Sequence, residues 1–452
     1  MVTFRSGESS RQRDEIAYDT ELSMQFIADK NCAPFEISLM TSSHEVLHPL
    51  PPLLHRYLLS VCVPLTVDRH GRHWADPLWA KDLALHLPYL ENLTLSCPVR
   101  LGQPSEEDIS LDQPPFDRLK IVSFPLPNSS IEVLIGLANR VRKTWSAIKG
   151  ADIVHTGFGG WPITEAWLDV PIAKAHRKFT VVNVENSMWR GKGYAGWRAK
   201  VVGALAERIN RFCVRSADLC FFTSTAYRDE FLGPHSNAGH VTPASWIDEN
   251  RILTDTEAEK IWANKIGRVR VAVVARLVPE KGLGVLLACL SNYSNELINL
   301  DLTIVGDGPL KSEWIEFLRT YSGPVTVRLQ TPLAYGDRFF KYIQSFDAII
   351  VPSVSDEQPR IILDAFSQAI PILGSSTGGI RELVVHNENG RLFRPNDPQS
   401  LYNILSWAAQ NRPSLRKFGM SALKLSRGRT HENMHAERHV ILCRALDLDR
   451  QA

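Results

Sequence analysis

Two cationic side chains follow one apolar run in the C-terminal half of the chain. Arg276 stands at the end of the run Val269–Leu277, and Lys281 follows five residues later, just before a helical pattern. Two cations beside a helix N-terminus supply the charge and the free amide groups that hold a diphosphate. A loop with solvated charges is the alternative explanation of this segment taken alone.

An acidic loop follows a later apolar run, Ala348–Val351. Asp356 lies in this loop, and Asp364 follows eight residues later, a turn or two into the next helical pattern. Such carboxylates suit sugar hydroxyls, because they accept charge-assisted hydrogen bonds. Acids that complement the dipole at a helix N-terminus are the alternative.

Two glycine-containing turns also follow apolar runs. Gly306-Asp307-Gly308 follows Leu302–Val305, and the segment 374–379 follows Pro371–Leu373. Glycine lets a backbone turn tightly or approach a ligand closely, and free amides at a helix start can hold phosphate oxygens. In open parallel sheets ligands bind beyond the carboxyl ends of the strands, so these segments predict one shared site.

The elements that would position these residues are short apolar runs alternating with longer helical patterns. The helical patterns include Ile131–Ile148, Trp197–Ser216 and Glu432–Leu446. The remaining predicted strands are Tyr57–Leu65, Leu93–Cys97, Lys120–Phe124, Asp152–Thr156, Phe179–Val184, Leu219–Thr223 and Val325–Leu329. Alternation of strand and helix indicates βαβ units and parallel sheets.

A polar stretch interrupts this rhythm and divides the chain into two α/β halves. We predict a flexible N-terminal extension over 1–52 and a first Rossmann-like domain over 53–247. A linker over 248–268 leads to a second Rossmann-like domain over 269–430. The last segment, 431–452, is expected to form a helix that returns to the first domain.

Composition narrows the class of protein. The 452 residues are 44% hydrophobic and carry a net charge of +2, which is too small to favour nucleic acid as a partner. The seven cysteines form no Cys-x-x-Cys pair, as is usual in a reducing compartment. Apolar runs reach about nine residues, far short of the ~20 that span a membrane, so we expect a cytoplasmic protein.

The four segments of the C-terminal half, taken in order, resemble one known family. They are ARLVPEKG, IVGDGP, PSVSDEQPRIILDAF and SSTGGIREL. They resemble the retaining glycosyltransferases of family 4, which have the GT-B fold of two Rossmann-like domains facing each other across a cleft. The resemblance is specific over 269–400 and only architectural over 55–245.

The resemblance implies roles for individual residues. Arg276 and Lys281 would contact the donor diphosphate, Asp356 the transferred sugar and Asp364 the ribose. Further donor contacts are implied for Gly306, Asp307, Gly308, Glu357, Gln358, Pro359, Arg360, Thr377, Gly378 and Gly379. This chain departs from the family pattern, because both motif acids are aspartates where the family has glutamates, and Glu357 replaces the usual glycine.

In the N-terminal half, Asp152–Gly157 resembles the family's strand that ends in histidine. His155 would shape the acceptor face or assist proton movement, and a structural histidine at a strand end is the alternative.

The implied reaction transfers a sugar from a nucleotide-diphosphate donor to a hydroxyl acceptor with retention of configuration. The acceptor would be a glycan, a lipid-linked molecule or a small molecule. Arg276 and Lys281 would stabilise the charge that grows on the leaving diphosphate, so no metal and no separate cofactor are expected. A catalytically silent sugar-nucleotide-binding protein and a sugar-nucleotide epimerase of the same fold are the alternatives.

Two other patterns predict different chemistry. His431-Glu432-Asn433-Met434-His435 matches the zinc-hydrolase pattern, but no suitable third ligand follows it in the sequence. The segment 189–215 is basic and amphipathic, which is typical of peripheral contact with the inner face of a membrane. A solvated helix face is the simpler explanation of that segment.

Overall fold

The computed structural model describes residues 51–127, 129–160, 163–185, 189, 197–234 and 236–449. The predicted extension 1–52 lies outside these residues except for its last two. Residues Arg190 and Lys192 of the basic segment also lie outside them.

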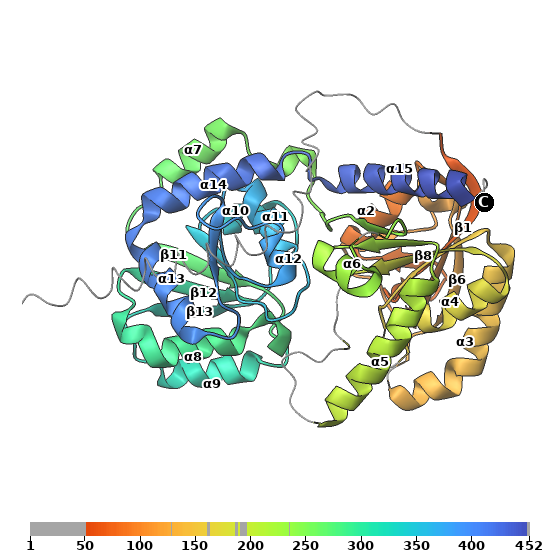
Figure 1. Ribbon diagram of the computed structural model, residues 1–452, viewed down its shortest axis with the longest axis horizontal. Helices are drawn as coiled ribbons and strands as arrows, with labels where there is room; N and C mark the ends of the chain where they lie inside the picture. The colour runs from red at the N-terminus through yellow and green to blue at the C-terminus, as the bar shows by residue number, and fades with distance from the viewer. Residues whose placement is uncertain are drawn as a thin grey trace, which may run out of the picture. The chain divides into compact units, whose positions relative to one another are not determined.

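The first half of the described chain is built on a largely parallel sheet (Figure 1). The strands run in the order β10-β9-β8-β7-β1-β4, with β6 paired to β4 and the short β2, β3 and β5 beyond it. Their bounds are β1 Leu53–Ser60, β2 Leu65–Val67, β3 His73–Ala75, β4 Leu90–Leu101, β5 Ile109–Ser110, β6 Lys120–Pro125, β7 Ile153–Gly157, β8 Phe179–Val184, β9 Leu219–Phe222 and β10 Gly239–Val241.

The first predicted strand, Tyr57–Leu65, is divided in the structure. β1 ends at Ser60 and β2 begins at Leu65. Pro64 stands directly before β2, and proline cannot donate a hydrogen bond to a neighbouring strand.

Helices connect the parallel strands of this sheet. They are α2 (Pro77–His86), α3 (Ser130–Gly150), α4 (Glu165–Ala175), α5 (Trp197–Ser216) and α6 (Thr225–Leu232). Short polar side chains fix where several of them start. Ser129 accepts a hydrogen bond from the backbone of Glu132 at the start of α3, and Asp76 caps α2 in the same way.

The second half has a fully parallel sheet in the order β13-β12-β11-β14-β15-β16. Its strands are β11 Val269–Val274, β12 Leu300–Val305, β13 Thr326–Gln330, β14 Ala348–Val351, β15 Ile372–Ser375 and β16 Gly390–Phe393. Its helices are α8 Leu283–Tyr293, α9 Lys311–Thr320, α10 Asp337–Ile343, α11 Ile361–Ser367, α12 Gly378–Arg381, α13 Pro398–Gln410 and α14 Arg412–Ser426. Strands β14, β15 and β16 are buried along their whole length, as expected when helices cover both faces of a sheet.

Two connecting segments join a core. The predicted linker 248–268 contains α7 (Asp255–Ala263), whose Trp262 belongs to the core of the second half and donates a 2.9 Å hydrogen bond to the carbonyl of Ala369. The last helix, α15 (His431–Asp449), adds Leu442 and Leu446 to the core of the first half.

Each half thus has its own sheet of mainly parallel strands with helices between them. This confirms the prediction of two Rossmann-like α/β halves.

None of the described helices is both long and apolar enough to cross a membrane.

Candidate functional site

A glycine determines where Lys281 lies. The 3₁₀ turn Pro279–Lys281 ends at Gly282, whose backbone is left-handed with φ 71°. A Cβ atom on Gly282 would lie only 1.7 Å from the carbonyl oxygen of Pro352, which directly follows β14. The absent side chain therefore lets the turn after β11 press against the loop after β14.

This close approach brings Lys281 into an ion pair with Glu357. Only 15% of the Lys281 side chain and 11% of the Glu357 side chain are exposed. Arg276 differs, because 59% of its side chain is exposed and its guanidinium lies 3.9 Å from the carboxylate of Glu280. The family pattern did not indicate the ion pair, since it has glycine at the position of Glu357.

The acidic loop also contacts the start of α12. The backbone amide of Gly378 donates a 3.1 Å hydrogen bond to Oδ1 of Asp356. A Cβ atom on Gly379 would lie 2.5 Å from the carbonyl oxygen of Glu357, so glycine is needed for this contact. Segments predicted separately at 356–360 and 377–379 are therefore in direct contact.

Asp364 lies deeper, in the buried helix α11. Its Oδ1 accepts a 2.7 Å hydrogen bond from the hydroxyl of Tyr335, a residue that the sequence did not indicate. Burial raises the pKa of Asp364 to about 6, although the Tyr335 hydrogen bond and the charge of Arg360 act in the opposite direction. Asp364 is therefore an acceptor whose charge is sensitive to pH just below neutrality.

Several buried polar atoms of these loops have no hydrogen-bond partner among the described residues. They are the hydroxyls of Ser355 and Thr377, both amide atoms of the Gln358 side chain, and Oε2 of Glu280. The four residues are between 5% and 7% exposed. Burying a polar group without a partner costs ~1–3 kcal/mol, so these loops are suited to a polar ligand that satisfies these atoms.

The turn Gly306-Asp307-Gly308 packs on the segment that carries Arg276. A Cβ on Gly306 would lie 2.0 Å from the carbonyl oxygen of Ala275, and the amide of Leu277 donates a 2.8 Å hydrogen bond to the carbonyl of Asp307. The Asp307 carboxylate is exposed and forms an ion pair with Lys311 at 2.9 Å. The turn thus supports the Arg276 loop through its backbone.

Comparison with known proteins identifies this half of the chain. Residues 268–411 match the family model described as glycosyl transferases group 1. The chain carries a group 1 glycosyltransferase domain. It is 24% identical over 324 residues to a sulfoquinovosyl transferase of Arabidopsis thaliana, covering 66% of this chain and 58% of that protein.

A second relative is named as a GDP-mannose-dependent phosphatidylinositol monomannoside mannosyltransferase of Mycobacterium tuberculosis. It is 28% identical over 215 residues, which cover 43% of this chain and 52% of that protein. The chain thus spans between half and two thirds of the length of these curated relatives.

Solved structures give the fold. The sucrose-phosphate synthase of Thermosynechococcus elongatus superimposes with a TM-score of 0.61 at 14% identity, over 88% of this chain and all of that one. Anabaena HepE in complex with UDP-glucose gives 0.59 at 16% identity, over 86% and 100%. The fold of the chain is GT-B.

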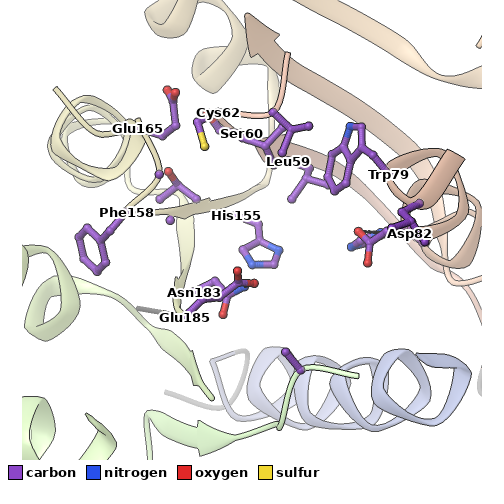
Figure 2. Close-up of a pocket in the computed structure, with 18 of the residues that line it drawn as sticks. Leu59, Ser60, Cys62, Trp79, Asp82, His155, Phe158, Glu165, Asn183 and Glu185 are labelled. Carbon is purple, nitrogen blue, oxygen red and sulfur yellow. Dashed lines mark hydrogen bonds and ion pairs between the residues drawn. The ribbon is translucent and has the colours of Figure 1, made fainter. Parts of the chain in front are cut away.

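The other half of the GT-B fold contains a cavity of about 470 Å³ (Figure 2). It is lined at the carboxyl ends of β1, β7 and β8, where Figure 2 shows Cys62, His155 and Glu185. Trp79 adds an apolar wall. Arg360, which directly precedes α11 of the glycosyltransferase domain, also lines the cavity, and its guanidinium lies 4.6 Å from the ring centroid of Trp246.

His155 is held within this cavity wall. Its Nδ1 lies 2.8 Å from the hydroxyl of Tyr57, and the side chain is almost fully buried. Burial and the nearby charge of Arg438 lower the pKa of His155 to about 3, so the imidazole is neutral at pH 7. A neutral imidazole with such a low pKa is a weak base, so His155 is poorly suited to accept a proton.

The zinc-hydrolase pattern has a buried partner that the sequence did not reveal. His431 and His435 both point their Nε2 atoms at Oδ1 of Asp82 on α2, at 2.9 and 3.2 Å. Glu432, which a hydrolase would need beside the metal, is exposed. These hydrogen bonds join α15 to α2 and account for both histidines within the group 1 architecture.

Proposed function

We propose that the chain is a retaining glycosyltransferase of family 4. In this proposal the second domain binds a nucleotide-diphosphate sugar, and the cavity of the first domain receives a hydroxyl acceptor. The observation that carries the proposal is the set of buried polar atoms without partners at Ser355, Gln358 and Thr377. Ser355 and Gln358 lie in the loop of Asp356, Thr377 directly precedes the Gly378 that bonds Asp356, and Glu357 of the same loop pairs with Lys281. Asp356 and Lys281 have the charges that a sugar and a diphosphate require.

The mechanism depends on charge that develops at the diphosphate as the glycosidic bond breaks. Lys281 and Arg276 would stabilise this charge, with Arg276 free to turn toward the ligand because most of its side chain is exposed. Asp356 and Asp364 would orient the sugar and the ribose through their hydroxyls. Since the two cations supply the positive charge, we propose that the reaction needs no metal.

A second candidate is a sugar-nucleotide-binding protein without turnover. The ion pair between Lys281 and Glu357 favours it, because Glu357 offsets the charge of a cation that should face the diphosphate. The first experiment is a thermal-shift screen with UDP-, GDP- and ADP-sugars. A ligand present at 100 times its dissociation constant should stabilise the fold by ~2.7 kcal/mol. Sugar transfer measured with the selected donor then separates the two candidates.

Substitution of the cations tests the site itself. Arg276→Ala and Lys281→Ala should each lower the rate of transfer by ~10²–10³-fold, as the loss of one transition-state donor does elsewhere. Arg319→Ala and Lys424→Ala are matched controls on exposed helix positions of the same domain and should leave the rate unchanged. Full activity of both site variants would contradict the assignment.

We further propose that the protein works in the cytoplasm. Six of the cysteines lie among the described residues, and all six are free thiols, as a reducing compartment maintains them. Peripheral membrane contact through the basic segment 189–215 belongs to the same proposal and is developed below.

A further inference from the structure

Three helices of different lengths lie on one face of the first sheet. α4 packs against both α3 and α5, so it lies between them. α3 has 21 residues, α4 has 11 and α5 has 20. Only two or three residues separate the end of each helix from the strand that follows it. The C-terminal ends of the three helices therefore lie at about the same height, at the amino edge of the sheet. At ~1.5 Å per residue, the first turns of α3 and α5 therefore extend about 14 Å beyond the start of α4.

Figure 1 shows helices α3 and α5, whose first turns are residues 131–138 and 197–205. Each of these two helix ends carries a set of exposed apolar residues. On α3 the residues Ile131, Leu134 and Ile135 are each at least 65% exposed. On α5 the residues Trp197, Val201 and Leu205 are each at least 59% exposed. Spacings of three and four residues place each set on one face of its helix. Single exposed apolar residues are ordinary, but a set of exposed apolar residues on one face of each of two helix ends indicates an interaction surface.

Positive charge is concentrated on the same two helices. α5 has five cations and one acid, and α3 has four cations and one acid, so together they carry +7 in a chain whose total is +2. The acid of α5, Glu207, is already paired with Arg211 at 2.8 Å. Lys200 and Arg208 are exposed beside the apolar face of α5, and Arg142 is exposed on α3.

We propose that the extended ends of α3 and α5 dock the protein on a bilayer that contains anionic lipid. The apolar side chains would enter the interfacial region while Lys200, Arg208 and Arg142 meet the headgroups. The two ends lie about 20 Å apart, two helix spacings, because α4 separates them. A bilayer accepts two separate apolar ends without a complementary shape, and the excess of positive charge matches anionic headgroups.

The docking surface and the acceptor cavity share one edge of the sheet. α3 follows β6 and α5 follows β8, and these strands are parallel to β7, so the starts of both helices lie at the carboxyl edge. His155 and Glu185, which line the cavity, belong to the ends of β7 and β8 at that edge. Resting on the proposed function, this arrangement assigns the acceptor to hydroxyl compounds carried by a membrane lipid.

Vesicle flotation of the full chain tests the docking. We expect binding to vesicles of phosphatidylcholine with 30% phosphatidylglycerol, and much weaker binding to phosphatidylcholine alone. The double variant Ile135→Glu/Leu205→Glu should lower the partition coefficient at least about tenfold, because each lost apolar side chain removes a buried contact. Lys200→Ala and Arg208→Ala should each lower it about fivefold, on anionic vesicles only.

Ile266→Glu is the matched control, because Ile266 is an 81% exposed apolar residue of the other half of the chain. It should bind vesicles like the unchanged protein. The proposal would be overturned if the double variant bound vesicles as well as the unchanged protein, or if Ile266→Glu lost as much vesicle binding as the double variant. It would also be overturned if the unchanged protein were a dimer that the double variant dissociates. Donor binding, followed by thermal shift without vesicles, should be the same in all variants. Vesicle binding by a protein that shows no transfer would reject the function and leave the docking intact.

Discussion

Replacing Gly282 with alanine should move Lys281 away from the loop that it contacts. Gly282 has a left-handed backbone, and the new Cβ would lie 1.7 Å from the carbonyl oxygen of Pro352. Ordinary contact of a Cβ begins near 3.4 Å, so the turn or the loop must shift by about 1.7 Å. Because Lys281 directly precedes Gly282, its ion pair with Glu357 cannot survive this shift unchanged.

The structure gives the size of the effect. A non-glycine residue in the left-handed region costs ~1–2 kcal/mol, and forcing extra volume into a packed site costs ~1–3 kcal/mol more. The sum of about 2–5 kcal/mol should lower the melting temperature of a domain of this size by at least ~4 °C. The affinity for a nucleotide-diphosphate sugar should fall about tenfold or more, since Lys281 no longer holds its position.

Gly284→Ala is the matched control two residues away. A Cβ there meets nothing within 4 Å, and Gly284 lies in the first turn of α8. Alanine favours the helix by up to ~1 kcal/mol relative to glycine, so this variant should melt at the same or a higher temperature and keep its donor affinity. Both variants are compared by thermal melting and by titration with the selected donor. If Gly282→Ala melts within 2 °C of the unchanged protein and binds donor normally, the close approach has no importance for the site.

Two further predictions concern protonation. Tyr335→Phe removes a hydrogen bond that lowers the pKa of Asp364, so this pKa should rise above about 6. As the pH is lowered from 8 to 5, the variant should therefore begin to lose donor affinity at a higher pH than the unchanged protein, which calorimetric titration measures. The same pH profile in both proteins would show that Asp364 does not contact the donor. His155 and His435 have pKa values of about 3 in the folded protein and near 6.5 when unfolded, so the unfolded chain takes up protons first. The part of the stability that depends on these two neutral histidines is therefore complete above pH 6.5 and is lost as the pH drops toward 3. It is measured as the change in urea midpoint between pH 7 and pH 5 in the unchanged protein, compared with the same change in His155→Gln.

Local patterns in the sequence were sufficient to predict the helices and strands and the loops that carry charged side chains. The strand Phe179–Val184 and the helix Trp197–Ser216 have the bounds that their periodicity predicts. The loops that follow β11 and β14 could be predicted to share one site, because the carboxyl ends of parallel strands lie at the same edge of a sheet. These features depend on residues close together in the chain.

Contacts between distant residues were not accessible to the same reasoning. Asp82 meets His431 and His435 across about 350 positions, and no periodicity connects them. Tyr335 lies in a loop without a motif, and its hydroxyl became relevant only when the fold placed it beside Asp364. Such pairings are properties of the packed structure.

Under the proposed function, Glu357 would position Lys281 for a donor at the place where the family has glycine. A buried lysine without a counter-charge would lose much of its hydration, and its positive form would be costly to maintain. Glu357 supplies that counter-charge and holds Lys281 in place before a ligand arrives. A diphosphate carries more negative charge than one carboxylate and offers several acceptor oxygens to the same ammonium group, which has three donors. In the proposed donor site, Glu357 would therefore retain one hydrogen bond while the diphosphate accepts another, so the acid that replaces glycine would position the cation without excluding the donor.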